Sequence, residues 1–307
     1  MLPHGVMFHH FHDDFHPAGQ GSMSGEQLRQ LLEWVGPGRI LRADEWYERA
    51  TSGTLRPQDV CLTFDDNLRC QFDVALPVLR QLGLTAFWFV YSSVLQGRIE
   101  PLEIYRHFRM TRFESVEDFY ESFFDTLAES SVGAMVDRQL SGFDPRGYLV
   151  DFPFYTDADR RFRYTRDELL GPDRYFKLMD QMIASAGLDV GATARSLWMD
   201  DAAIKTLYAQ GHVIGLHSHT HPTRLNRLSE REQREEYGQN HDHLSGLLGT
   251  PPLTMSHPCN SYDDQTLRVL AGLGIRLGFR ANVSQPNFGP LEHPREDHAN
   301  LLRRMAA

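Results

Sequence analysis

The chain has 307 residues, with 31 Lys and Arg against 41 Asp and Glu, so its formal net charge is −10 when histidine is neutral. A hydrophobic content of 41% and a charged content of 23% are those of an ordinary globular protein, which excludes disordered, collagen-like and coiled-coil chains. The acidic balance argues against a nucleic-acid partner, because surfaces that bind nucleic acid are basic. The 15 histidines are the unusual number, and histidine is the commonest metal ligand and proton carrier.

The sequence also indicates a compartment. No Lys or Arg precedes Arg29, so the N-terminus lacks the basic segment that opens a secretory signal. No apolar run approaches the roughly 20 residues that span a bilayer. Cys61, Cys70 and Cys259 form an odd set without CxxC spacing, which fits reduced thiols better than a disulfide framework. We therefore expect a cytoplasmic protein with no membrane span.

Short apolar runs bounded by turn residues predict strands that are buried on both faces. In chain order they cover residues 5–11, 39–41, 60–64, 85–91, 212–217, 252–256 and 276–281. Helical patterns lie between several of them: Ser24 is expected to cap a helix over 26–34, and further helices are expected over 74–82 and 263–273. This alternation predicts parallel strands with outer helices, in an open sheet or a barrel, and ligand sites at the C-terminal ends of the strands.

One long stretch interrupts this alternation. Between about Gly97 and Trp198 no run predicts a strand, whereas helical patterns recur, for example over 116–127 behind Ser115 and over 175–186. We therefore expect a largely helical insertion over residues 97–198, within a single barrel formed by residues 1–96 and 199–307. Such an insertion is expected to form a wall or lid over an active site.

The first candidate site is Thr63-Phe64-Asp65-Asp66, which ends the run that begins at Val60. Two neighbouring carboxylates repel each other, and a cation between them relieves the repulsion. An Asp pair also serves as a helix cap or a polar turn, so this pair alone does not decide between the two.

The second candidate site is His217-Ser218-His219-Thr220-His221-Pro222. His217 and His221 are four residues apart, which places them on one side of either a helix or a strand. Both imidazoles can then reach one metal ion, and such ligands suit Zn²⁺, Co²⁺ or Ni²⁺. His219 joins them only if the segment is extended, and the alternative is a solvated histidine-rich turn.

Together these motifs resemble the polysaccharide deacetylases, which are also called the NodB-homology fold or family 4 carbohydrate esterases. Thr63-Phe64-Asp65-Asp66 is similar to the family's first motif, and His217-Ser218-x-x-His221 matches its second motif, His-(Ser/Thr)-x-x-His. The resemblance covers roughly residues 5–96 and 199–300, and it includes these flanking segments in the usual order: Ala75-Leu76-Pro77-Val78-Leu79, Gly83, the run 85–90, Gly211-His212-Val213-Ile214-Gly215 and Ser256-His257-Pro258-Cys259-Asn260-Ser261-Tyr262.

The resemblance implies a distorted (β/α) barrel, here with about seven strands, and the metal-dependent hydrolysis of an acetyl group on a sugar. Asp66, His217 and His221 would hold a divalent metal, with Zn²⁺ the expected ion and Co²⁺ or Ni²⁺ as alternatives. Asp65 would be the general base for a metal-activated water that attacks the acetyl carbonyl.

The third motif of the family contributes to the substrate site, so the resemblance implies substrate contacts by Pro258, Cys259 and Tyr262. A backbone N–H near Cys259 would stabilise the oxyanion. His9 follows the first expected strand, where similar proteins often carry an aromatic–His pair, and it is a further candidate for substrate binding.

The sequence departs from the family pattern at three points. Ser256 stands where the third motif often has an Arg that holds the base, and Asn67 replaces the Gly that commonly follows the second Asp. The closing Leu-x-His motif, which supplies the general acid, has only a loose counterpart in Leu291-Glu292-His293. We expect His293 to be the acid, with His298 as a rival, and we hypothesise that Arg295 supplies the missing guanidinium.

The function expected from the sequence is therefore that of a cytoplasmic, metal-dependent hydrolase whose substrate is an N-acetylated sugar, sugar precursor or polysaccharide. Two alternatives stay open. One is hydrolysis of another non-peptide C–N bond, and the other is a degenerate member that binds metal without turnover.

Overall fold

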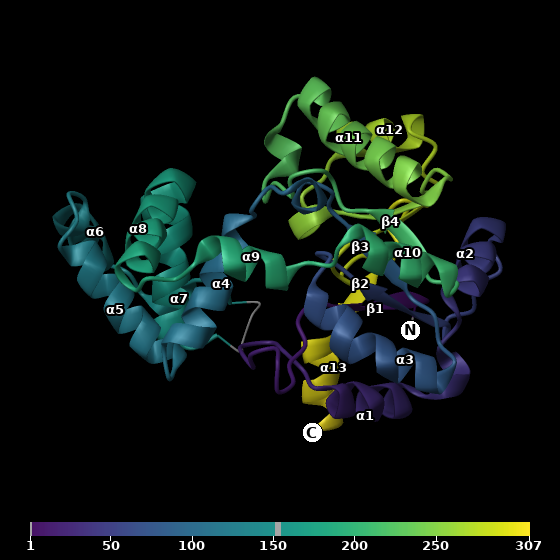
Figure 1. Ribbon diagram of the computed structural model, residues 1–307, viewed down its shortest axis with the longest axis horizontal. Coiled ribbons are helices and arrows are strands. Elements are labelled where there is room, and N and C mark those ends of the chain that lie inside the picture. The colour runs from purple at the N-terminus through teal and green to yellow at the C-terminus, as the bar shows by residue number, and fades with distance from the viewer. Residues whose placement is uncertain (1, 151–154) are drawn as a thin grey trace. The chain divides into compact units, whose positions relative to one another are not determined.

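The computed structural model describes residues 2–150 and 155–307, and the chain divides into two compact units (Figure 1). One unit consists of Met1–Ile99 and Ser196–Ala307, and the other of Glu100–Arg195. Each unit is described by itself.

The first unit is built on seven parallel strands in the order β6-β5-β4-β3-β2-β1-β7. The strands are β1 (His4–Phe8), β2 (Val60–Phe64), β3 (Phe87–Val90), β4 (Val213–Leu216), β5 (Thr254–Ser256), β6 (Leu277–Phe279) and β7 (Arg295–Asp297). The sheet curls into a nearly closed barrel, because Phe279 of β6 forms a parallel bridge with His293, two residues before β7. The predicted α/β barrel of about seven strands is confirmed.

One predicted strand is wrong and one strand was missed. Residues 39–41 do not form a strand: Pro37–Arg39 is a 3₁₀ turn, and Ile40 makes only a single bridge to Val60. Pro37 fixes a turn-compatible φ, which ends extended structure there. The missed strand, β7, reads Arg-Glu-Asp. Hydrophobic periodicity cannot find such a strand, because all three of its residues are charged and only Arg295 is buried.

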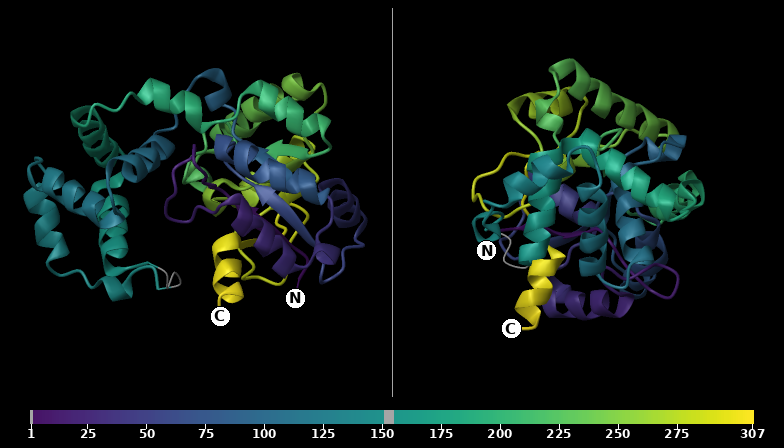
Figure 2. Two further views of the ribbon diagram at one scale, coloured as in Figure 1. Left: turned by 60° about the horizontal axis from the view of Figure 1, so that its bottom comes forward. Right: turned by 90° about the vertical axis from the view of Figure 1, so that its left-hand side faces the viewer.

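Helices cover the outside of the barrel (Figures 1 and 2). They are α1 (Gly25–Val35), α2 (Ala43–Ser52), α3 (Leu76–Leu82), α10 (Asp201–Ala209), α11 (Glu230–Leu248), α12 (Asp264–Gly272) and α13 (His298–Met305). Ser24 caps α1 with a full capping box, as predicted, and α13 packs on α1. Among the described residues, no helix combines the length and the apolar character needed to cross a bilayer.

The second unit is helical throughout its described part. Its helices are α4 (Pro101–Arg112), α5 (Val116–Ala128), α6 (Gly133–Leu140), α7 (Asp157–Tyr164) and α8 (Gly171–Ser185), and α9 (Val190–Leu197) leads out of it. An aromatic core holds it together, in which the buried ring of Phe162 contacts Phe119, Phe123 and Tyr175. That this unit acts as a wall or lid stays a prediction.

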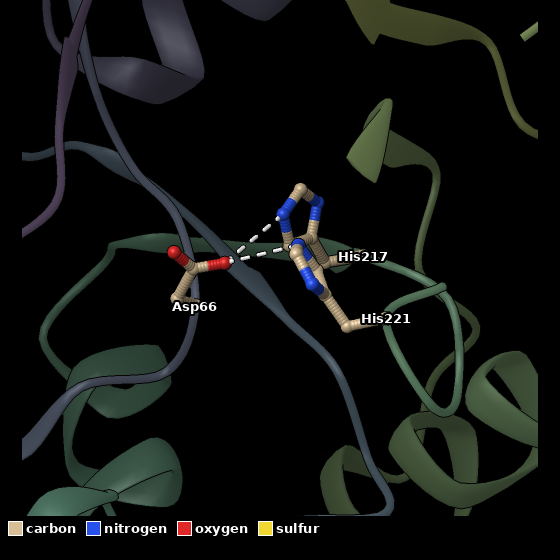
Figure 3. A group of neighbouring side chains, drawn as sticks. All are labelled: Asp66, His217 and His221. Carbon is tan, nitrogen blue, oxygen red and sulfur yellow. Dashed lines mark ion pairs between the residues drawn. The ribbon is translucent and has the colours of Figure 1, made fainter. Parts of the chain in front are cut away.

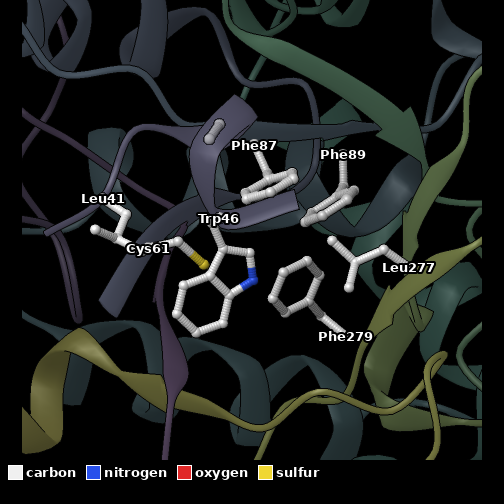
Figure 4. Packing of buried hydrophobic residues seen from close by; sticks show 8 residues of the cluster. Leu41, Trp46, Cys61, Phe87, Phe89, Leu277 and Phe279 are labelled. Carbon is white, nitrogen blue, oxygen red and sulfur yellow. The ribbon is translucent and has the colours of Figure 1, made fainter. Parts of the chain in front are cut away.

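Large apolar side chains fill the interior of the barrel (Figure 4). Trp46 from α2 packs among Cys61 of β2, the two phenylalanines of β3 and Phe279 of β6. Side chains on a strand alternate between its faces, so Cys61, Thr63 and Asp65 point the same way. The interior face of β2 therefore passes from an apolar core to a carboxylate at the C-terminal end of the strand.

Gly215 allows β4 to pack closely against its neighbours. A Cβ atom there would lie 2.5 Å from Thr254 Oγ1 and 2.7 Å from two ring carbons of Phe89. Gly215→Ala is therefore expected to destabilise the protein by about 1–3 kcal/mol through overpacking. Gly238→Ala is the matched control: nothing lies within 4 Å of a Cβ at this position in α11, and helix propensity predicts a gain of roughly 0.5–1 kcal/mol. Urea unfolding midpoints should move in opposite directions, and a shared direction would contradict this packing.

Candidate active site

The C-terminal ends of four strands bring most of the candidate residues to one end of the barrel. Asp65 and Asp66 follow directly on β2, and His217 follows directly on β4. Ser256 is the last residue of β5, and His9 follows directly on β1. Arg295, the first residue of β7, reaches this group through the barrel interior. Parallel strands place their carboxyl ends at one edge, so residues far apart in sequence converge.

Asp66, His217 and His221 form the compact centre of the site (Figure 3). Asp66 Oδ1 lies 3.3 Å from His217 Nε2 and 3.3 Å from His221 Nε2. This oxygen is buried and has no hydrogen-bond donor among the described residues. One carboxylate oxygen and two imidazole nitrogens within 4.8 Å of one another fit a divalent cation with three protein ligands and open positions.

Backbone strain points these ligands inward. Asp66 has a φ of 77°, and His221 and Ser218 have φ values of 53° and 62°. Non-glycine residues seldom adopt the left-handed region, and where they do the surrounding structure must hold them there. The Ser218 hydroxyl does so for the histidine turn, by accepting a hydrogen bond from the His221 backbone N–H at 3.1 Å.

Ser256 orients the ring of His217. His217 Nδ1 lies 2.8 Å from Ser256 Oγ and 3.0 Å from the Ser256 carbonyl oxygen. Since a carbonyl can only accept, the ring proton is on Nδ1 and the lone pair of Nε2 faces Asp66. A hydrogen bond of this kind fixes the tautomer of a metal-binding histidine.

Electrostatics within the centre favour ionised carboxylates. Burial raises the pKa of Asp66, but the imidazoles of His221, His217 and His9 outweigh burial and lower it far below the ordinary value. Burial lowers the pKa of His217, but Asp65 and Asp66 outweigh burial and raise it. For His221, burial prevails and the pKa is lowered. Asp66 is therefore ionised, and a cation bound between the three groups would balance its negative charge.

Asp65 is held apart from this centre by Arg295. Arg295 donates a hydrogen bond to Asp65 Oδ1 at 2.7 Å, and both side chains are almost fully buried, with 1% and 3% exposed. The Ser256 hydroxyl donates to the same oxygen at 3.2 Å. Burial raises the pKa of Asp65, but the Arg295 guanidinium lowers it more, with help from His217. The carboxylate is therefore ionised, and its Oδ2 faces His217 Nε2 at 4.0 Å.

Of the remaining predicted residues, His9 lies in the site. Its Nε2 is 3.9 Å from Asp66 Oδ2 and 4.0 Å from Asp65 Oδ2, and its side chain is 29% exposed. Pro258 and Cys259 form a turn directly after β5, at the same end of the barrel, where Cys259 is exposed and has a φ of 50°. The ring of Tyr262 stacks on His257, and its hydroxyl donates to Glu292 at 3.0 Å.

The structure does not bring the two predicted acids to the centre. His293 packs against Trp46, Phe279 and Phe288, with 6% of its surface exposed, and burial lowers its pKa to about 4. His298 lies under Phe8, and its ring nitrogens face the carbonyl oxygens of Met7 and Gly21. Burial lowers its pKa as well.

Three supporting residues of the site were not predicted from the sequence. Asn240 of α11 accepts a hydrogen bond from the His217 backbone N–H at 3.0 Å and donates one to the Val90 carbonyl at 2.9 Å. Trp198 is buried and donates to the hydroxyl of Tyr91. A polar helix residue and an aromatic strand end carry no sequence signal for such contacts.

Comparison with known families bears on this geometry. Residues 180–278 match the family model described as polysaccharide deacetylase. The predicted resemblance to this family is confirmed. The match includes the second motif, with His217 and His221, and the third motif, whereas Asp65 and Asp66 lie outside the matched residues. No curated protein sequence gives a significant match.

Solved deacetylase structures share the fold at low sequence identity. The Streptococcus pyogenes deacetylase PplD, in complex with acetate, has a TM-score of 0.57 and 16% identity, over 99% of this chain and 97% of that one. IcaB from Ammonifex degensii has a TM-score of 0.57 and 15% identity, over 100% and 98%. The BpsB deacetylase domain from Bordetella bronchiseptica has a TM-score of 0.54 and 12% identity, over 96% and 95%.

Removal of Arg295 tests the buried ion pair. Arg295→Ala leaves the Asp65 carboxylate buried without its partner, which should cost about 3–5 kcal/mol at pH 7. Because Arg295 lowers the pKa of Asp65, the wild-type carboxylate stays ionised at pH 5 and is protonated only below about pH 4, whereas burial without the guanidinium makes the carboxylate of the variant take up its proton at higher pH. The stability difference between the two proteins should therefore shrink as the pH falls from 7 toward about 3.

Arg304→Ala is the matched control, since Arg304 forms a partly exposed ion pair with Glu296 whose loss should cost under about 1 kcal/mol. Urea unfolding at both pH values measures these differences. Equal losses for the two variants, or a difference that does not change with pH, would contradict the role of the pair.

Proposed function

We propose that the chain is a hydrolase that depends on a divalent cation and removes the N-acetyl group from a carbohydrate. Asp66, His217 and His221 hold the cation, with Zn²⁺ the expected ion and Co²⁺ or Ni²⁺ as alternatives, and Asp65 is the general base. One observation carries the proposal: Asp65 is fixed by Arg295 and Ser256 beside the triad of ligands, without being part of it.

This arrangement divides the chemistry between two neighbouring carboxylates. When bound, the cation lowers the pKa of water and polarises the acetyl carbonyl. Asp65, kept ionised by the guanidinium, accepts the proton of the attacking water. Arg295 also prevents Asp65 Oδ1 from turning toward the ligands, so its Oδ2 is the oxygen available for proton transfer.

The leaving amine needs a proton, and the geometry favours His9 as its donor. His9 faces both carboxylates and is partly exposed, whereas His293 lies in the aromatic core. We therefore assign this step to His9 in place of the predicted His293. The Pro258–Cys259 turn, at the same end of the barrel, is proposed to contact the sugar. Tyr262 supports this turn through its stacking on His257.

The position of Arg295 weighs against a degenerate member of the family. That alternative rests on Ser256 in place of an Arg and on the weak closing motif. Arg295 answers the first ground, because it supplies a guanidinium to Asp65 from β7. Acetate release from N-acetylhexosamines and their oligomers that depends on added Zn²⁺, Co²⁺ or Ni²⁺ tests the proposal. Ring opening of cyclic amides without acetate supports hydrolysis of another C–N bond, and cation binding without turnover supports a degenerate member. The cytoplasmic location stays a prediction.

One variant of each carboxylate separates the roles of the two. Asp65→Asn should retain cation binding, measured by calorimetry, and lose about 10²–10⁴-fold in kcat, because the base is removed. Asp66→Ala should lose cation binding, and activity with it. Asp201→Asn, an exposed change in α10, is the control and should leave both unchanged. Full activity of Asp65→Asn would rule out the assigned base.

The pH dependence of cation binding gives a second test. The pKa of His217 is raised in the metal-free protein, so protons compete with the cation already at pH values near neutrality, and occupancy should fall as the pH is lowered toward 5. Asp65 stays ionised over this range, because its pKa is lowered. The acid limb of activity should therefore move to lower pH when excess cation is added. Occupancy that is unchanged down to about pH 4.5 would contradict imidazole ligation.

A further inference from the structure

The loop that carries Asp66 is strained at two consecutive residues. Asp66 and Asn67 have φ values of 77° and 57°, both in the left-handed region. Asn tolerates this region better than most residues, and Gly adopts it without strain. Two such residues in a row persist only where neighbouring segments hold them. The direction of the Asp66 side chain depends on that support.

The support comes from Trp198 and Met199, about 130 residues further along the chain. The Met199 backbone N–H donates to the Asn67 carbonyl at 2.9 Å, and the side-chain Nδ2 of Asn67 donates to the Met199 carbonyl at 3.3 Å. Leu68 and Trp198 form an antiparallel bridge directly beside this pair. Asn67 is almost completely buried, so its two bonds to Met199 are shielded from water.

The same short segment also reaches the support of His221. The indole N–H of Trp198 donates to the hydroxyl of Tyr91, and the ring of Tyr91 lies 5.3 Å from that of His221, centroid to centroid. Trp198 and Tyr91 are both buried. Residues 198 and 199 therefore contact the neighbours of two ligands that come from different loops, one after β2 and one after β4.

We propose that Trp198 and Met199 form a brace that sets the spacing between Asp66 and His221, with Asn67 and Trp198 as positioning residues of the cation site. The inference rests on the proposed function, because it concerns the same three ligands. Asn67, which departs from the Gly common at this position in the family, gains from this departure a side-chain bond to the brace. The brace follows directly on the helical unit in the chain, so the inserted sequence ends at a segment that organises the centre.

Asn67→Gly is the sharpest test, because Gly retains the left-handed turn and the backbone bond from Met199 and removes the side-chain bond to the Met199 carbonyl. Changes to residues that orient metal ligands typically weaken metal binding 10–100-fold. We expect Asn67→Gly and Trp198→Phe each to weaken Co²⁺ binding about tenfold or more, measured by calorimetry. The visible absorption spectrum of bound Co²⁺ should also change, since it reports the geometry of the ligands and does not depend on turnover.

Trp88→Phe is the matched control. Trp88 is also buried and donates its indole N–H to a side chain, His212 Nδ1, at 3.1 Å, yet it has no contact with the three ligands or the brace. This variant should lose comparable stability in thermal melts with EDTA and retain the wild-type Co²⁺ affinity and spectrum.

The outcomes separate the brace from the proposed function. Wild-type affinity and spectrum in both Asn67→Gly and Trp198→Phe would overturn the brace and leave the cation site standing. Equal weakening in Trp88→Phe would also overturn it, because the effect would then follow from stability alone. Failure of the wild-type protein to bind Co²⁺, Zn²⁺ or Ni²⁺ would overturn the proposed function itself.

Discussion

The buried ion pair between Arg295 and Asp65 links the closure of the barrel to its chemistry. Arg295 belongs to β7, which pairs with β1, and its guanidinium crosses the interior to the end of β2. Its Nε also donates to the Arg280 carbonyl, beyond β6. The Arg295 side chain thus connects β7 both to the segment after β6 and to the segment after β2. A charge in the interior is tolerable only because its partner is equally buried, so neither residue can change alone without a large penalty.

In the centre of the site, burial and the attraction between opposite charges shift the pKa values in opposite directions. Burial opposes charge on its titratable groups. For Asp66 and His217 the attraction between carboxylates and imidazoles outweighs burial, for Asp65 the Arg295 guanidinium is the main offset, and for His221 burial prevails. The two carboxylates differ in what holds them. Asp65 is fixed by a guanidinium and a hydroxyl, whereas Asp66 Oδ1 faces only imidazole nitrogens. This difference is the reason why two adjacent residues of the same type can take different roles.

Hydrophobic patterns in the sequence predicted the apolar strands, but they missed a strand whose buried residue, Arg295, is charged and paired with Asp65. The strands β1 to β6 were predicted from their apolar composition. The two motifs predicted that Asp66, His217 and His221 converge, and the backbone turns after β2 and β4 complete this convergence. β7 was missed because its residues are charged and only Arg295 is buried, and the strand predicted over 39–41 was wrong because two apolar residues, Ile40 and Leu41, do not outweigh the turn that begins at Pro37. Asn240, Tyr91 and the brace act through contacts across 23 to 150 residues of sequence, and no local pattern encodes such pairs.

The place of the helical unit in the topology has a consequence for how such proteins diversify. Residues 100–195 lie within the single connection between β3 and β4, which are neighbouring, directly paired strands. Exchange of the whole unit for another module would leave the strand order and every pairing in the barrel intact. The junction is asymmetric along the chain, however: residues 91–99 lie between β3 and the helical unit on the incoming side, while the outgoing side carries Trp198 and Met199 within four residues of the end of the unit at Arg195. Recombination at this locus would be tolerated only where the graft ends upstream of those two residues.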